Sequence, residues 1–231
     1  MVLRRRKKKP VHKRNLVAHL NPKSPISEQY RTLRTNIQFS VVDEEIHSIM
    51  VTSAGPGEGK STTVANLAVV FAQQGKRVLL IDADMRKPTA HYTFNLGNGI
   101  GLTNVLMRQV TLQEASQETF VPNLDLLACG PIPPNPAELL SSKSMKRFLK
   151  GVYDEYDLVL FDSPPLLAVT DAQVIANQVS GTILVASSEE THRDALVKAK
   201  ESLVTAKAKI LGVVLNNLNI DDTNLYYYNR N

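Results

Sequence analysis

Short apolar runs alternate along the chain with longer stretches in which apolar residues recur every three or four positions. The short runs are typical of strands that are buried on both faces, and the longer stretches have the period of amphipathic helices. This alternation predicts an α/β domain of three layers, with a mainly parallel central sheet between two layers of helices. We expect strands at 48–53, 77–82, 124–128, 157–162, 181–187 and 210–218.

Helices are expected between these strands and before the first of them. The segment 24–39 predicts a helix that begins after Pro25, with Ser27 as its cap. The order of residues from Asn135 to Glu138 indicates another helix start: a cap residue, a proline and a carboxylate that reaches back. The other helices are expected near 60–75, 102–108, 136–155, 171–179 and 191–207.

The composition fits one folded domain in a reducing compartment. The chain has 231 residues, of which 43% are hydrophobic, and Cys129 is its single cysteine, so no intrachain disulfide can form. No apolar run approaches the roughly 18 residues that a membrane helix needs. We therefore expect a cytoplasmic protein without a signal peptide or a spanning segment.

The net charge of +5 is concentrated at one end. Residues 1–14 hold eight basic residues and no acid, which leaves a charge of −3 on the rest. We expect a basic flexible arm at 1–23, a folded domain at 24–218 and a tail that contains a cluster of tyrosines at 219–231. The arm suits contact with an anionic membrane leaflet or an acidic partner, or it is solvated and has no partner; nucleic acid is a weaker alternative.

The segment from Ala54 to Ser61 reads AGPGEGKS and lies between a predicted strand and a predicted helix. In such a loop the glycines let backbone N–H groups approach phosphate oxygens, the lysine reaches the outer phosphates and the hydroxyl binds Mg²⁺. The sequence therefore predicts an ATP site. The expected ATP contacts are Gly55, Pro56, Gly57, Glu58, Gly59, Lys60, Ser61 and Thr62.

Aspartates follow two of the predicted strands. Asp82 and Asp84 end one apolar run and Asp162 ends another, and parallel strands end at the same edge of a sheet. A carboxylate beside triphosphate repels it unless Mg²⁺ intervenes, so Asp162 is interpreted as a metal-holding residue. For Asp82 and Asp84, metal contact and orientation of the attacking hydroxyl both stay open, and a helix cap is a weaker alternative for Asp84. The expected metal site comprises Ser61, Asp82, Asp84 and Asp162, and the expected catalytic residues are Lys60, Asp82 and Asp84.

Three of the seven tyrosines, Tyr226, Tyr227 and Tyr228, lie within the last six residues. They are either apolar anchors of a contact or substrates of the ATP site. If the last strand is parallel to the others, the tail leaves the sheet from the nucleotide edge. Its 13 residues then reach at most about 45 Å, which is enough to serve a neighbouring subunit.

The phosphate loop, the segments VLLIDADMRKP, LVLFDSPP and GPIPPNPAELL, and the tyrosine-ended tail together resemble the bacterial tyrosine kinases of capsule and exopolysaccharide synthesis, in their free-standing cytoplasmic form. The resemblance runs from about Ser27 to Tyr228. It implies an Mg²⁺- and ATP-dependent kinase that phosphorylates its own tyrosine cluster and regulates polysaccharide synthesis. In that family the pair matching Asp82 and Asp84 is called Walker A′, and the residue matching Asp162 belongs to Walker B.

The resemblance also implies partners. These are a transmembrane activator that brings the kinase to the inner face of the membrane, a phosphotyrosine phosphatase, protein tyrosine substrates and further copies of the chain in a ring. Glu28, Arg31 and Arg34 match the family's ring-contact pattern, although their spacing alone predicts only an ordinary ion pair on a helix.

The chain departs from the motifs of two other groups of proteins, the ParA- and MinD-like ATPases and the eukaryotic protein kinases, which argues against both. Gly55 stands where ParA- and MinD-like ATPases have a signature lysine. The run from His192 to Asp194 spells a eukaryotic kinase motif, but Ala199 replaces the required asparagine, and Thr191 indicates a helix cap instead. A non-kinase ATPase switch or scaffold of polysaccharide export remains the alternative function.

Two further expectations concern details of the site. An aspartate titrates near 4 and a tyrosine near 10, so full proton transfer to Asp82 before phosphoryl transfer is uphill by about six units. We therefore expect Asp82 to orient the hydroxyl and to take its proton late. Asn216 and Asn217 either contact the base or serve as structural amides, and the structural role is favoured.

Overall fold

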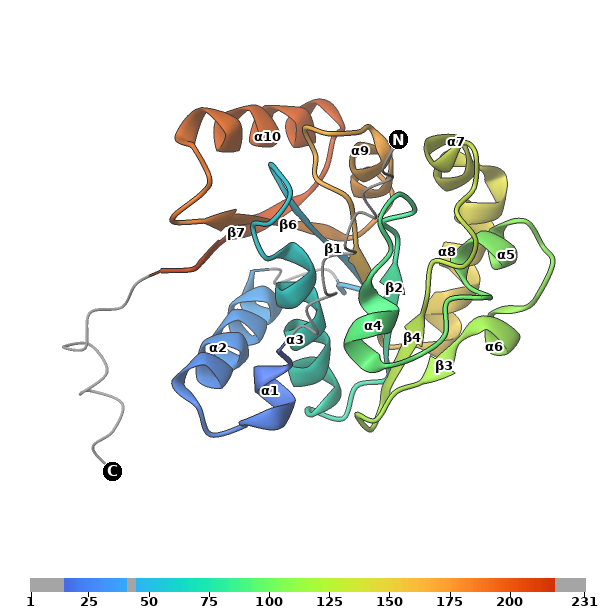
Figure 1. Cartoon of the computed structure of the whole chain (residues 1–231), viewed down its shortest axis with the longest axis horizontal. Helices are drawn as coiled ribbons and strands as arrows, with labels where there is room; N and C mark the ends of the chain where they lie inside the picture. The colour runs from blue at the N-terminus through green and yellow to red at the C-terminus, as the bar shows by residue number, and fades with distance from the viewer. Residues whose placement is uncertain (1–14, 41–44, 219–231) are drawn as a thin grey trace, which may run out of the picture.

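The computed structural model describes residues 15–40 and 45–218, so the basic run 1–14 and the tyrosine cluster lie outside the described residues. A seven-stranded sheet forms the middle of the fold, in the order β3-β4-β2-β5-β1-β6-β7 (Figure 1). All neighbouring strands are parallel except β3, which pairs antiparallel with β4. The predicted mainly parallel sheet is confirmed. The strands are β1 (Ser48–Ser53), β2 (Val78–Asp82), β3 (Gln117–Glu118), β4 (Leu124–Leu127), β5 (Leu158–Asp162), β6 (Gly181–Ser187) and β7 (Ile210–Asn216).

Helices cover both faces of the sheet, as the three-layer prediction requires. The described helices on one face are α1 (Val17–Leu20), α2 (Pro25–Phe39), α3 (Lys60–Ala72) and α4 (Ala90–Phe94). Those on the other face are α5 (Leu102–Leu106), α6 (Leu112–Ala115), α7 (Pro136–Ser141), α8 (Lys143–Glu155), α9 (Asp171–Ala176) and α10 (Arg193–Thr205). None of the described helices is long and apolar enough to cross a membrane.

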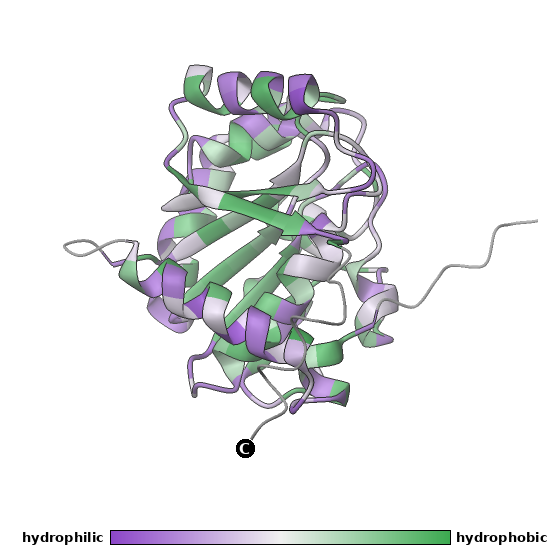
Figure 2. Cartoon of the chain, turned by 90° about the vertical axis from the view of Figure 1, so that its left-hand side faces the viewer, coloured by the Kyte–Doolittle hydropathy of each residue, from purple (hydrophilic) through white to green (hydrophobic). Residues whose placement is uncertain are grey.

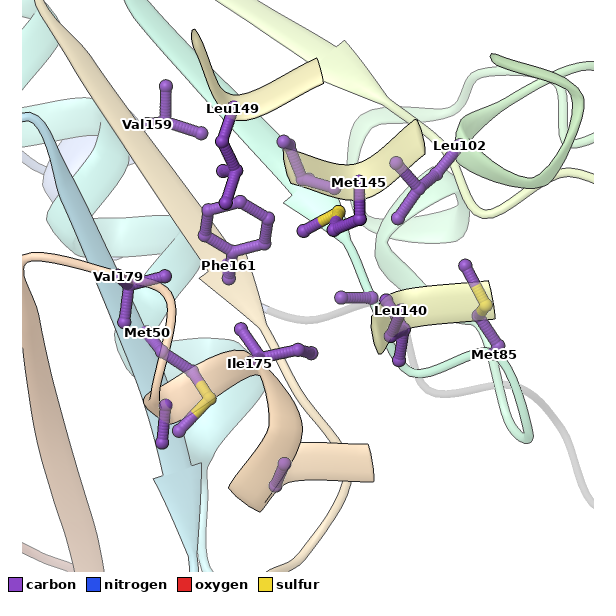
Figure 3. Packing of buried hydrophobic residues seen from close by; sticks show 14 of the residues in the cluster. Met50, Met85, Leu102, Leu140, Met145, Leu149, Val159, Phe161, Ile175 and Val179 are labelled. Atoms are coloured by element: carbon purple, nitrogen blue, oxygen red, sulfur yellow. The ribbon is translucent and has the colours of Figure 1, made fainter. Parts of the chain in front are cut away.

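The central strands are apolar on both sides because each side faces a layer of helices. Alternate residues of one strand enter different cores: Met50 packs beneath α8 and α9, whereas Ile49 and Val51 pack against α3. The hydrophobic colour of the strands lies between helices with hydrophilic outer faces in Figure 2. Figure 3 shows Phe161 of β5 among the side chains of α8 and α9 in one of these two cores.

The start of α2 differs from the prediction. Ser24, not Ser27, caps the helix, and its Oγ accepts a hydrogen bond from the Ser27 backbone N–H at 3.1 Å. Pro25 is the first helical residue. Ser27 lies inside the helix and is buried, where its Oγ donates to the Asn21 carbonyl oxygen at 2.7 Å and lies 3.1 Å from that of Val17. The predicted cap residue therefore joins α2 to the segment before it.

The folded part begins earlier than the predicted boundary at residue 23. Leu16 is 3% exposed and Ala18 is fully buried. The Ala18 backbone N–H donates to Asn66 Oδ1 at 3.0 Å, and Gln73 Nε2 donates to the Ala18 carbonyl at 3.0 Å. Both partners belong to α3, so residues 15–23 are part of the domain rather than of a flexible arm.

Two other helix boundaries also correct the prediction. The helix expected over 136–155 is divided at Ser142, whose extended backbone ends α7 and whose Oγ accepts from the Met145 N–H to start α8. At the start of α10 the cap position is His192, and Thr191 Oγ1 accepts from the Ser187 N–H instead. A start at Asn135 is confirmed, but its side-chain amide bonds Glu138 and not the backbone.

Candidate active site

The phosphate loop joins β1 to α3 at the carboxyl edge of the sheet. Gly57 and Gly59 have φ of 89° and 94°, in the left-handed region that favours glycine. Gly59 has a second reason to be glycine, because a Cβ there would lie 1.9 Å from Nδ2 of Asn216 on β7. That amide donates to the Glu58 carbonyl oxygen at 3.1 Å. The last strand therefore holds the loop from the side.

Lys60 and Ser61, the first residues of α3, face two of the predicted aspartates. Lys60 Nζ lies 3.7 Å from Asp84 Oδ2 and 3.7 Å from Asp162 Oδ1. Ser61 Oγ donates to Asp162 Oδ1 at 2.8 Å, and Lys60 Nζ donates to Ser61 Oγ at 3.1 Å. These side chains come from α3, from the end of β5 and from the segment after β2, so the predicted convergence at one edge is what the structure has.

Asp82 is the most enclosed of the three aspartates. It is 0% exposed, and its Oδ2 accepts from the N–H groups of Thr89 and Ala90, each at 2.8 Å. Asp82 and Asp162 are partners across β2 and β5. Burial, and then the charge of Asp162, raises the pKa of Asp82 to about 7. Asp82 is thus more enclosed than Asp84, and its expected role in orienting the acceptor hydroxyl stays a prediction.

Asp84 has one oxygen for the backbone and one for the site. Its Oδ1 accepts from the N–H groups of Arg86 and Lys87, at 3.3 and 3.0 Å, which fixes the turn after β2. Its Oδ2 is the atom that faces Lys60. Asp84 is therefore held rigidly with a free lone pair directed at the lysine that would contact the outer phosphates.

The oxygen ligands present fit a magnesium ion in the company of a nucleotide. Among the described residues there is no group of three or more His, Cys, Asp or Glu side chains that could hold a metal alone. Magnesium, however, usually takes one or two protein oxygens and completes its shell with phosphates and waters. Ser61 Oγ and Asp162 Oδ1 are such a pair. Asp82, with both oxygens on backbone N–H groups, is the least suited of the four predicted ligands.

Sequence reasoning missed an ion pair that supports the turn after β2. Arg86 Nε and Nη2 donate to the two carboxylate oxygens of Asp171, at 2.9 and 3.1 Å. Asp171 is fully buried in the first turn of α9, so the pair ties this turn to the opposite helix layer. The two residues are 85 positions apart, and no spacing rule connects them.

Other predicted residues lie away from this cluster or outside the described chain. Glu28 and Arg31 form an ion pair on α2, and Arg34 Nη1 donates to the Val70 carbonyl of α3 at 2.8 Å. The three tyrosines of the tail are not described. Asn217 Nδ2 donates to Ser187 Oγ at 3.1 Å, so both candidate asparagines have structural contacts.

Known proteins resemble this chain over most of its length. A family model described as an AAA domain matches residues 46–195. Tyrosine-protein kinase YwqD of Bacillus subtilis (strain 168) is 55% identical over 215 residues, 93% of this chain and 91% of that protein. Putative tyrosine-protein kinase CapB of Staphylococcus aureus is 44% identical over 213 residues, 92% of this chain and 93% of that one. The crystal structure of the chimerical protein CapA2B2 has a TM-score of 0.85 at 45% identity, with 88% of this chain and 89% of that chain covered.

Proposed function

Because this chain belongs to the bacterial tyrosine kinases of capsule and exopolysaccharide synthesis, we propose that it phosphorylates the tyrosine cluster of its own tail, between subunits. The acceptors are Tyr226, Tyr227 and Tyr228. The donor is ATP, with Mg²⁺ held by Ser61 and Asp162. The result regulates polysaccharide synthesis in the cell.

The observation that carries this proposal is the position of β7. The strand runs parallel to β6, and Asn216 at its end contacts the carbonyl of Glu58 in the phosphate loop. Whatever follows residue 218 therefore leaves the domain at the edge where the nucleotide site lies. Residues 219–231 can span at most about 45 Å.

The side chains at this edge suit phosphoryl transfer, which depends on positioning and on neutralising charge. When bound, Mg²⁺ neutralises and orients the phosphates. Lys60, now shared by Asp84 and Asp162, is placed to contact the outer phosphates. Asp84 orients the tyrosine hydroxyl through Oδ2. Asp82 takes the tyrosine proton late, and because burial raises its pKa toward that of tyrosine, this transfer is less uphill than transfer to a free aspartate.

Partners follow from family membership as part of the proposal. A transmembrane activator brings the kinase to the inner face of the membrane, where the eight basic residues of 1–14 add attraction to anionic lipids. Glu28, Arg31 and Arg34 contribute to contacts between copies in a ring. Each phosphate adds about −1.5 to −2 charge, so a modified tail is repelled from the carboxylate-rich site and loosens the ring until a phosphatase resets it.

Mixing two variants tests transfer between subunits. One protein carries Lys60→Met and an intact tail, and the other is active but lacks residues 225–231. We expect phosphotyrosine on the Lys60→Met chain, because its own site cannot hold the outer phosphates. No label on that chain, with the active partner still hydrolysing ATP, would contradict transfer between subunits.

A further inference from the structure

A cavity of about 400 Å³ lies beside the phosphate loop. Gly55, Pro56 and Glu58 of the loop form part of its lining, and Leu167, Glu190 and His192 form much of the rest. Lys60 and Ser61, which face the aspartates of the site described above, do not line this cavity. It is bounded by the segment after β5 and by the segment that leads into α10.

Two carboxylates in this cavity lack a cation. Glu58 is 5% exposed, and its Oε2 is buried without a hydrogen-bond partner. Glu190 lies against the loop, because a Cβ added at Gly57 would be 3.3 Å from Glu190 Oε2. In the described part of the chain neither carboxylate takes part in an ion pair. Glu190 is exposed, but the buried carboxylate of Glu58 is costly without a partner, so the cavity suits a positively charged group.

The tail offers one cation of the right kind. Among residues 219–231 the single basic residue is Arg230, two positions after Tyr228. Two extended residues span about 7 Å. Since Gly55 and Pro56 belong both to the phosphate loop and to the cavity, a tyrosine at the nucleotide would leave this arginine beside the cavity. A guanidinium presents a planar fork of donors that can serve two carboxylates at once.

We propose that Arg230 of a neighbouring copy's tail enters this cavity and pairs with Glu58 and Glu190. The pair holds the tail in register, so that the tyrosines before it reach the nucleotide. The choice of occupant rests on the proposed function, while the cavity and its unpaired carboxylates are features of the fold itself. The subsite makes the cluster a preferred acceptor over a tyrosine that lacks a following arginine.

Peptide binding tests the subsite directly. The receptor is the full chain carrying Arg230→Gln, so that its own tail does not compete, and the probes are fluorescent peptides of residues 219–231 with Arg230 or with glutamine. By anisotropy we expect the arginine peptide to bind about tenfold more tightly. Adding Glu190→Gln to the receptor should abolish that difference. The matched control Glu189→Gln, next to the lining residue, should leave the difference intact.

Equal affinities of the two peptides would overturn the proposal. It would also be overturned if Glu190→Gln weakened the binding of both peptides by the same factor. If Glu190→Gln instead changed only the particle mass in light scattering, the cavity would belong to a subunit contact and the proposal would fail. Phosphate transfer is measured separately. If the peptides are phosphorylated but bind equally well with or without Arg230, the subsite is wrong and the proposed function stands. If binding depends on Arg230 but no peptide is phosphorylated, the subsite is supported and the tail is not the substrate.

Discussion

Gly59 is the residue at which the phosphate loop and the last strand meet. Its φ of 94° strains any other residue, and a Cβ would collide with the Asn216 amide that fastens the loop to β7. Gly75, three residues after the end of α3, has a similar φ of 91° but nothing within 4 Å of an added Cβ. Comparing substitutions at the two glycines therefore distinguishes the effect of backbone strain alone from that of a steric clash with Asn216.

We expect Gly75→Ala to cost about 1 kcal/mol in the free energy of unfolding, because the backbone strain is its only penalty. Gly59→Ala should cost more and should weaken ATP binding at least tenfold, because Asn216 must leave the loop. Urea unfolding and nucleotide titration measure the two effects. If the two variants lost the same free energy of unfolding and bound ATP equally well, the contact between β7 and the loop would be contradicted.

Asp82 gives the nucleotide-free protein a specific dependence on pH. The unfolded chain loses this proton near 3.8, whereas the folded chain keeps it until about 7, because burial raises the pKa. The stability that protonated Asp82 contributes is complete below about pH 4 and is lost as the pH rises through 7. The change in free energy of unfolding caused by Asp82→Asn should therefore be more favourable at pH 8 than at pH 4, by up to a few kcal/mol.

Urea unfolding of the nucleotide-free protein at pH 4, 6 and 8 checks this prediction. The exposed Asp157, which is 45% exposed in its pair with Arg77, supplies the control variant Asp157→Asn. A wild-type protein and an Asp82→Asn variant with parallel stability curves from pH 4 to 8 would show that Asp82 is not held in its neutral form.

At the scale of elements, the pair of Arg86 and Asp171 connects the turn after β2 to α9. Asp171 is fully buried, so Arg86→Met leaves a carboxylate without its partner. Arg86 is itself 46% exposed, which lets water offset part of the cost. We expect a loss of at most about 3 kcal/mol, with most of it recovered when Asp171→Asn is added.

The exposed pair of Arg77 and Asp157 is the matched control for this experiment. Its atoms lie 3.7 Å apart at 60% and 45% exposure, and such pairs contribute at most about 1 kcal/mol. Thermal unfolding of Arg77→Met should thus show a much smaller shift than that of Arg86→Met. Similar shifts would mean that the buried carboxylate does not depend on its arginine.

The elements also show what a sequence can predict. Six of the seven strands followed from their apolar runs, and those in the middle of the sheet are buried on both faces, whereas the two-residue β3 was not predicted. The meeting of Asp82, Asp84 and Asp162 followed from the common edge of parallel strands. Helix α1 was not predicted because four residues are too few to show a helical period of apolar positions. The break at Ser142 was not predicted because the apolar pattern continues through it. Contacts between distant segments, such as Asn216 with the phosphate loop, obey no local rule.

At the scale of the whole molecule, α2 is the predicted contact between copies. We expect Arg31→Ala with Arg34→Ala to lower the particle mass in light scattering to that of a monomer. Arg34 also bonds the Val70 carbonyl within the chain, so the variant's thermal midpoint must be measured alongside. Gln38→Ala, on the same helix as the two arginines, is the control, because it removes only an intrachain hydrogen bond from Gln38 Nε2 to Gln74 Oε1 beyond the end of α3. An unchanged mass for the double variant would refute the contact.

The central claim is that the site transfers phosphate to the chain's own tyrosine cluster. The most direct measurement incubates the purified protein with labelled ATP, Mg²⁺ and a cytoplasmic activator fragment, and then identifies the labelled residues. We predict stable label on Tyr226, Tyr227 and Tyr228, and its loss when all three are replaced by phenylalanine. Release of free phosphate without label on tyrosine would contradict the claim and would indicate an ATPase switch.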